Sequence, residues 1–172
     1  MEEHQYDLKI PEERVAVLVG TEGKTKKEIE TESKCTLEIS KEGDVVISGE
    51  DALLAYTTRE IVRAIGRGFN PKIALLLLKM DYTLEIIDMK VIAGKNKNTM
   101  ERLKGRVIGT NGKARQEIEH LTDTNISVYG KTIGIIGQVD QVSVAREAVA
   151  MLLRGSMHKT VYQFLERKRK EM

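Results

Sequence analysis

The chain has 172 residues, of which 41% are hydrophobic and 31% charged, and its formal net charge is +2. This composition is typical of a folded soluble protein with one ordinary domain or two small ones, and it excludes a disordered chain. The longest apolar run, residues 73–78, is too short to cross a bilayer, and the acidic, polar start lacks a secretory signal, so we expect a cytoplasmic protein.

The first half predicts a strand, two helices, two strands and a third helix. Residues 6–10 alternate as a short strand, and Pro11 suits the first position of a helix that ends at Gly20. After a glycine loop, the pattern predicts a helix over 24–33, strands over 35–40 and 44–49, and a helix over 51–65. Asn70 and Pro71 then open a linking helix, whose continuous leucines predict burial on nearly all sides.

The second half predicts the same order of elements. A strand is expected over 82–92, followed by a helix that begins at the N-cap Asn98, has Glu101 as its capping-box partner and ends at Ile108. After the second glycine loop come a helix, strands over 124–129 and 133–137, and a helix over 145–155. Residues 157–172 form a closing helix with Val161, Phe164 and Leu165 on one face.

The two halves repeat each other. Residues 20–30, GTEGKTKKEIE, match residues 109–119, GTNGKARQEIE, at seven positions. A period of 89 residues is too long for a solenoid unit, so it indicates a duplicated domain. The sequence therefore predicts an α+β protein with one domain over residues 1–80, which includes the linking helix, and one over residues 81–172, which includes the closing helix.

Charge is distributed unequally between these halves. Residues 1–86 carry 12 lysines and arginines against 17 acids, and residues 87–172 carry 16 against 9. Between residues 90 and 115 there are eight basic residues and one acid, Glu101. A basic zone around a glycine loop suggests a polyanionic partner, although a solvated charged face gives the same pattern.

The glycine loop does not fit a nucleotide-binding P-loop. A Walker A motif, GxxxxGK[ST], needs a first glycine where the two copies have Leu18 and Val107. In the second copy Ala114 also replaces the hydroxyl that binds Mg²⁺. The loop follows a helix rather than a buried strand, which counts further against this interpretation.

The loop fits a clamp for a nucleic-acid backbone better. Glycines have no Cβ, so a GxxG turn between two helices lets a polynucleotide come close, and we expect the amides of residues 111–113 to face it with the helix dipole behind them. KH domains hold about four nucleotides in this way. The order of elements around both loops predicts tandem type I KH domains, each β-α-α-β-β-α with a three-stranded sheet packed on helices. The alternative is that the glycines only end one helix and start the next.

The two copies are not expected to be equivalent. The first loop carries Glu22 where a phosphate would lie, whereas the second carries the uncharged Asn111. We therefore predict RNA binding by the second copy, and a scaffolding or protein-contacting role for the first. The predicted RNA-binding residues are Lys104, Arg106, Ile108, Gly109, Thr110, Asn111, Gly112, Lys113, Arg115, Ile118 and Ile126.

No other chemistry is expected. The three histidines and the single Cys35 lack the spacing of metal ligands, and no nucleophile or carboxylate pair indicates catalysis, so the protein is predicted to be neither an enzyme nor a metal or cofactor binder. Cys35 lies in a strand-like run and is expected to be a small buried residue. Aromatic residues are too few for an RRM-type stacking platform, which leaves single-stranded RNA in a narrow groove.

Over residues 6–164 the layout resembles a specific family, the archaeal counterparts of the KH factor of eukaryotic small-subunit ribosome biogenesis. The most specific stretch is residues 64–78, which contains IGRGFNP, and residues 107–122, VIGTNGKARQEIEHLT, form the second clamp. The resemblance implies a non-enzymatic protein that binds the 3′ end region of 16S rRNA through its second KH domain. It further implies the α subunit of translation initiation factor two, the rRNA dimethylase and the 3′-end maturation nuclease as partners. The remaining alternatives are a general KH-type RNA-binding regulator and a protein–protein adaptor.

Overall fold

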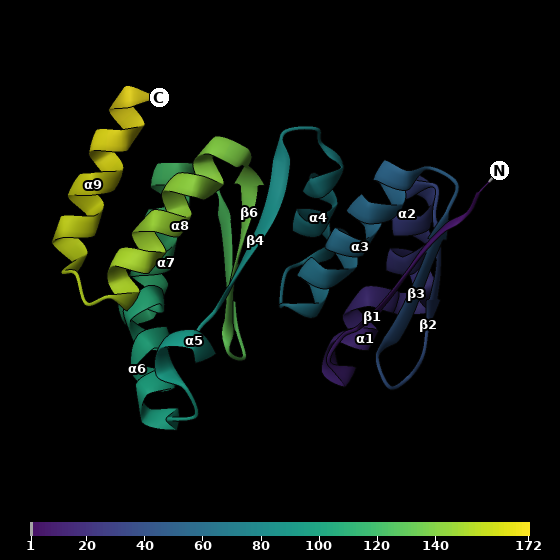
Figure 1. Cartoon of the computed structure of the whole chain (residues 1–172), viewed down its shortest axis with the longest axis horizontal. Coiled ribbons are helices and arrows are strands. Elements are labelled where there is room, and N and C mark those ends of the chain that lie inside the picture. Colours follow the sequence, from purple (N-terminus) through teal and green to yellow (C-terminus); the bar gives the residue numbers. More distant parts are fainter. Residues whose placement is uncertain (1) are drawn as a thin grey trace. The chain divides into compact units, whose positions relative to one another are not determined.

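The computed structural model describes residues 2–172, which divide into two compact units, residues 2–80 and residues 81–172 (Figure 1). Each unit contains a three-stranded antiparallel sheet whose central strand is its last strand in the sequence. The α+β class and the tandem arrangement predicted from the repeat are confirmed. Within residues 2–172, no helix is long and apolar enough to serve as a membrane span.

The first unit begins with β1 (His4–Lys9), α1 (Glu12–Val19), a single 3-10 turn η1 (Thr21–Gly23) and α2 (Lys24–Ser33). It continues with β2 (Thr36–Ile39), β3 (Asp44–Gly49), α3 (Ala52–Gly66), α4 (Pro71–Ala74) and the 3-10 turn η2 (Leu75–Leu78). The strand order is β1-β3-β2. Alternate residues of β3, Val45 and Ile47, are buried, because one face of the sheet packs on helices and the other meets water.

The second unit begins with β4 (Tyr82–Asp88), α5 (Lys90–Ala93), α6 (Lys97–Ile108), the 3-10 turn η3 (Thr110–Gly112) and α7 (Lys113–Thr122). It continues with β5 (Asn125–Tyr129), β6 (Thr132–Gln138), α8 (Val139–Leu153) and α9 (His158–Glu171). The strand order is β4-β6-β5, and six of the seven residues of β6 are buried. The central position of β6 explains its glycine- and isoleucine-rich sequence.

The helices of the second unit share one core with the sheet. Val107 of α6, Ile118 of α7 and Val149 of α8 are fully buried and belong to the same cluster as Ile133 and Ile135 of β6. The closing helix α9 packs against α7 and α8 (Figure 1). It contributes Val161 and Leu165, both fully buried, while Phe164 is partly buried beside them.

Several predicted element boundaries were wrong. The strand expected over 82–92 ends at Asp88, whose carboxylate accepts a hydrogen bond from Lys90 N (2.9 Å) at the start of α5. The N-cap of α6 is Asn96, which accepts from Thr99 N at 3.0 Å, rather than Asn98. Pro11 occupies the N-cap position of α1 instead of its first helical position.

The linking segment also differs from the prediction. It forms one short α-helical turn and then a 3-10 turn, and of its four leucines only Leu77 is buried. Asn70 does cap it as predicted, by accepting a hydrogen bond from Lys72 N at 2.9 Å. A run of leucines is equally compatible with a short, partly exposed turn, so the sequence pattern overestimated both its helical length and its burial.

Candidate nucleic-acid interface

The two glycine loops have the same backbone conformation. The first glycines, Gly20 and Gly109, have φ/ψ of 76/172° and 75/176°, and the last, Gly23 and Gly112, have 72/15° and 77/10°. The middle residues Glu22 and Asn111 lie at 57/27° and 56/28°. The first loop is therefore an intact clamp in shape, and the difference between the copies is chemical.

The two glycines of each loop are required for different reasons. A Cβ on Gly109 would lie 2.6 Å from Ala114 Cβ, and one on Gly20 would lie 2.7 Å from Thr25 Cβ, so the first glycine is needed inside the turn. A Cβ on Gly23 would meet nothing within 4 Å, and one on Gly112 would have only the Gln116 side chain, at 3.8 Å. The second glycine leaves the outer surface of the loop bare, where a ligand backbone can approach.

The residue before the last glycine of each loop makes the second loop better suited to a phosphate than the first. Left-handed backbone is tolerated best by asparagine among residues with a side chain, so Asn111 suits its position and Glu22 is strained there. Both residues are exposed, and only Glu22 brings a negative charge. An incoming phosphate would meet repulsion at the first loop alone.

The expectation of bare amides at residues 111–113 was wrong for two of the three. Gly112 N donates to Gly109 O at 3.2 Å, and Lys113 N donates to Thr110 O, which closes the 3-10 turn. These amides are therefore engaged within the loop. What the loop offers a polyanion is close approach, the positive end of the α7 dipole and the nearby cations.

Arg106 is held inside the second unit. Its Nε donates to Leu152 O at 2.8 Å and its Nη2 to Ser156 O, so the guanidinium satisfies carbonyls at the C-terminal end of α8. His158 Nε2 lies 2.8 Å from Arg106 O. Since a carbonyl only accepts hydrogen bonds, Nε2 of His158 carries the proton. The predicted role of Arg106 as a free RNA-binding cation does not fit these bonds.

The first unit builds the same contact from a different position. Arg14 Nε donates to Ile65 O at 2.8 Å and its Nη2 to Phe69 O at 2.9 Å, at the C-terminal end of α3. Arg14 lies six residues before the first glycine of its loop, whereas Arg106 lies three before, about one helical turn away. Sequence alignment of the repeats does not pair these arginines, which is why the signal was missed.

Arg115 is also paired. Its Nη1 lies 2.8 Å from Oε1 of Glu119, and Oε2 of Glu119 accepts a hydrogen bond from Ile126 N of the edge strand β5 at 2.8 Å. Glu30 does the same in the first unit, where it accepts from Leu37 N at 2.9 Å. The repeated glutamate therefore joins the helix after the loop to the edge strand, and Arg115 has part of its charge neutralised.

The unpaired positive charge lies elsewhere. Lys104 is 3.7 Å from Glu101, so among the four predicted cations only Lys113 has neither an ion pair nor a side-chain hydrogen bond within residues 2–172. Arg102 forms none in the same range and is exposed, although the sequence prediction did not include it. Together Arg102 and Lys113 give the region around Gly109 its available cations.

The apolar residues among those predicted to bind RNA mainly belong to the core. Ile118 is 0% and Ile126 5% exposed, and both belong to the hydrophobic core of the second unit, so they support the groove rather than line it. Ile108 and Val128 are partly exposed. Of the predicted isoleucines, Ile108 is the one whose side chain remains accessible beside the loop.

A hollow of about 430 Å³ adjoins the second loop. Its lining includes three predicted residues besides Arg106, namely Gly109, Thr110 and Lys113, and residues that the prediction missed, Arg102, Gly105, Ala114, His158 and Tyr162. Burial raises the pKa of the Tyr162 phenol above its ordinary value, and the negative charge of Glu117 raises it further, so the phenol is neutral at physiological pH. Tyr162 and His158 come from α9, a helix that no repeat comparison places near the loop.

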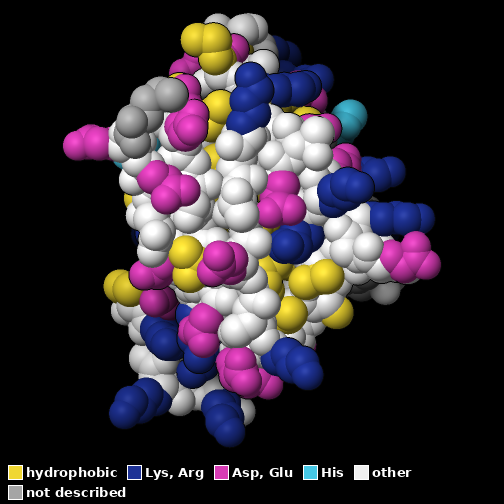
Figure 2. Space-filling model, turned by 90° about the vertical axis from the view of Figure 1, so that its right-hand side faces the viewer, with side chains coloured by type: hydrophobic (Ala, Val, Ile, Leu, Met, Phe, Trp, Pro, Cys, Tyr) yellow, Lys and Arg dark blue, Asp and Glu magenta, His cyan; other side chains and the backbone are white. Residues whose placement is uncertain are grey.

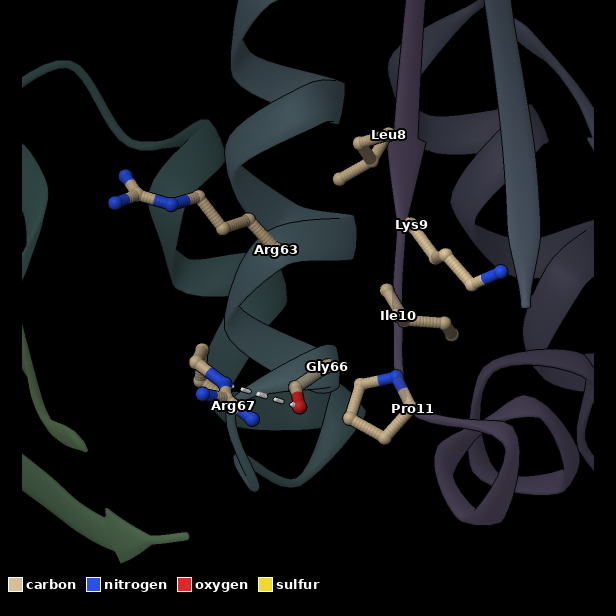
Figure 3. Close-up of a pocket in the computed structure, with 7 residues that line it drawn as sticks. All are labelled: Leu8, Lys9, Ile10, Pro11, Arg63, Gly66 and Arg67. Carbon is tan, nitrogen blue, oxygen red and sulfur yellow. Dashed lines mark hydrogen bonds between the residues drawn. The ribbon is translucent and has the colours of Figure 1, made fainter. Parts of the chain in front are cut away.

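A second hollow, of about 440 Å³, lies between β1 and the end of α3 in the first unit. Figure 3 shows Leu8 pointing toward α3 and Arg63 pointing away from β1. A Cβ on Gly66 would lie 2.7 Å from Ile10 Cγ2, so this glycine lets α3 approach the strand. On the side of the molecule shown in Figure 2, acidic and basic side chains are intermingled without a broad field of one sign.

No metal site is present in residues 2–172, because no three histidine, cysteine or acidic side chains there are grouped to hold an ion. Cys35 is buried, as predicted, with Thr58 Oγ1 3.4 Å from its sulfur. The second glycine loop therefore offers a ligand its bare outer surface and the charges of Arg102 and Lys113.

Comparison with protein families matches both units. A model described as a eukaryotic-type KH domain, KH-domain type I, matches residues 83–170, and a model described as a KH domain matches residues 5–61. The KH domain-containing protein MJ0443 of Methanocaldococcus jannaschii is 52% identical over 169 residues, which cover 96% of this chain and 74% of that protein.

More distant relatives are named as pre-rRNA-processing proteins. The pre-rRNA-processing protein PNO1 of Candida albicans is 36% identical over 107 residues, 60% of this chain and 38% of that protein, so the match spans less than half of it. Among solved structures, a chain in the a/eIF2α–aDim2p–rRNA complex from Pyrococcus horikoshii has a TM-score of 0.92 at 43% identity, and the match covers 99% of this chain and 96% of that one.

Proposed function

The chain belongs to the family of KH-domain proteins, and from that premise we propose that it binds single-stranded RNA during maturation of the small ribosomal subunit. The RNA in this proposal is the 3′ end region of 16S rRNA, held by the second unit. Support comes from relatives named as pre-rRNA-processing proteins and from the similar chain found in a complex with rRNA.

The bare second glycine of the loop carries the proposal. Gly112 has open space where a Cβ would stand, and the neighbouring Asn111 is uncharged and relaxed in the left-handed conformation. Lys113 is exposed at the start of α7, whose dipole adds positive potential. Ile108 offers partly exposed apolar surface for a base beside the loop.

The first unit has the same loop shape but carries a negative charge where the second loop is uncharged, which supports a different role for it. Glu22 takes the place of Asn111, and Glu28, Glu30 and Glu32 follow on α2. We propose that this unit acts as a scaffold or protein-contacting module. The α subunit of translation initiation factor two is its proposed partner, since a similar chain occurs in a complex with that protein, and the rRNA dimethylase and the maturation nuclease are further candidates.

A matched pair of substitutions tests the assignment of RNA to the second unit. Gly112→Asp and Gly23→Asp each place a carboxylate on an open left-handed position that aspartate tolerates, so both variants are expected to fold. Repulsion between a carboxylate and a phosphate about 4 Å away amounts to roughly 1–4 kcal/mol, or at least fivefold in affinity. The measurement is fluorescence anisotropy with an oligonucleotide of the 16S rRNA 3′ end.

We expect Gly112→Asp to weaken binding and Gly23→Asp to leave it unchanged. The reverse pattern would assign the RNA to the first unit. If neither variant loses affinity for the RNA, neither glycine loop belongs to the binding site. Circular dichroism of both variants controls for folding.

The choice of RNA has its own test. Crosslinking of the protein in cells, followed by sequencing of the attached RNA, should enrich the 3′ terminus of 16S rRNA. Enrichment of many messenger RNAs without that terminus would favour a general KH regulator instead. Salt dependence gives a second check, because four to six phosphate contacts predict that log K falls with log salt at a slope of about −3 to −4.

A further inference from the structure

We propose that the hollow between α6, the second glycine loop and α9 is an additional nucleotide subsite, which extends the RNA footprint beyond the clamp. This inference rests on the proposed RNA-binding function of the second unit. The hollow has a volume of about 430 Å³, within the range of pockets that hold small ligands.

The subsite adjoins the face of α6 that carries Ile108 and extends around the helix from it. Successive helical residues are about 100° apart, so Lys104 and Ile108 share one face. Arg102 lies about 120° from Ile108 around the helix, and Gly105, about 60° from Ile108, lies between them, on the side away from the buried Val107. A strand that passes over Gly109 from the Ile108 face therefore continues into the hollow, because the loop borders both.

The chemistry of the hollow suits a nucleotide, since it combines cations for the phosphate with rings for the base. Arg102 and Lys113 form no ion pair within the described chain, so their charges are available to an anion. The wall of the hollow also contains Gly105, where a Cβ would meet nothing within 4 Å, and Gly109. A backbone phosphate can approach this wall without obstruction.

The hollow is also lined by two rings. Tyr162 and His158 have ring centroids 6.2 Å apart with planes inclined by 56°. The hydrogen bond from His158 to the Arg106 carbonyl holds its ring, and Arg106 is itself held by α8. Bases stack on such rings with little sequence preference. The negative charge of Glu117, which adds to the raised pKa of Tyr162, favours a base rather than a phosphate beside these rings.

The subsite belongs to the second unit alone. Its rings come from α9, which follows the repeated elements, and the repeated elements of the first unit are followed by the short α4 instead. Lys113 also has its counterpart in Lys24, but Arg102 and Gly105 correspond to Glu13 and Ala16 when the loop glycines are aligned. The closing helix therefore adds a wall to one clamp and not to the other.

The test uses the full chain and oligonucleotides of the 16S rRNA 3′ end, from four to ten nucleotides long. Gly105→Gln fills the hollow with a neutral side chain from an open helical position, and Gly105→Ala adds only a Cβ there as a matched control. In the wild-type protein and in Gly105→Ala, affinity should keep rising beyond four nucleotides. In Gly105→Gln it should stop rising, with a loss of roughly 5- to 150-fold for the longest oligonucleotide, the range expected for one stacked base.

Two further variants separate this inference from the proposed function. Tyr162→Ala should reproduce the loss for long oligonucleotides and Tyr162→Phe should not, whereas Gly112→Asp should weaken binding at every length. If Gly112→Asp weakens binding but Gly105→Gln leaves the dependence on length unchanged, the subsite is refuted while the clamp stands. If Gly112→Asp has no effect at any length, the proposed function fails and the subsite with it.

Discussion

Replacement of Arg106 by leucine should lower stability much more than RNA affinity. The change removes two hydrogen bonds from a charged donor, to Leu152 O and Ser156 O, and leaves both carbonyls at the end of α8 without their partner. Hydrogen bonds of charged groups contribute about 1.5–3 kcal/mol each, and partial hydration of the freed carbonyls reduces the sum to roughly 2–4 kcal/mol. For a chain of this length that corresponds to a fall in Tm of roughly 4–16 °C.

The assay combines thermal unfolding with RNA titration well below the lowered Tm. Arg14→Leu removes the corresponding bonds in the first unit and should cost a similar amount of stability with no effect on RNA. Lys113→Ala should do the opposite, with a change in Tm within about 2 °C and weaker binding, because this lysine is exposed and forms no ion pair in residues 2–172.

The refuting result is an Arg106→Leu protein with unchanged Tm and a loss of RNA affinity equal to that of Lys113→Ala. That outcome would mean that the guanidinium leaves α8 to contact the RNA. It would restore the role predicted from the sequence for Arg106.

Three other substitutions or measurements follow from the same contacts. Gly109→Ala should destabilise the protein by roughly 2–6 kcal/mol in urea unfolding, because the backbone conformation of Gly109 is nearly restricted to glycine and a Cβ there would clash. Gly112→Ala should cost only about 1–2 kcal/mol in the same assay. Equal losses of stability in the two variants would contradict this difference between the glycines. Glu119→Ala leaves the Ile126 amide unpaired and should lower the free energy of unfolding by about 1–3 kcal/mol in the same assay. Replacement of an exposed glutamate by alanine is the control and should change the stability little. Cys35 is buried, so Ellman's reagent should react with it only as fast as the protein unfolds; rapid labelling of the native protein would refute that burial.

The fold was predictable because its signals are local and occur twice. Alternating apolar residues, glycines at the loop ends and capping residues such as Asn70 each act within a few positions, and the repeat made each assignment twice. The errors came where local preference is weak. The strand that stops at Asp88 and the linking segment that holds only one helical turn are both compatible with the predicted patterns.

The candidate site was only partly predictable from composition and spacing. Lysines and arginines near a loop look alike in a sequence, but the structure separates Arg106, bound to α8, and Arg115, bound to Glu119, from the unpaired Lys113. Similarly, the isoleucine pattern identified the apolar positions, but it did not show that Ile118 is fully buried in the core.

The sequence alone therefore determined the duplication, the order of elements, the two glycine loops and the difference in charge between Glu22 and Asn111. These features depend on residues close together in the chain. Only the tertiary structure decided which cations are available and that α9 brings Tyr162 and His158 to the second loop. The engagement of Arg106 and the position of α9 depend on contacts between residues some 50 positions apart, and such contacts are set by how helices pack and which carbonyls remain to be satisfied.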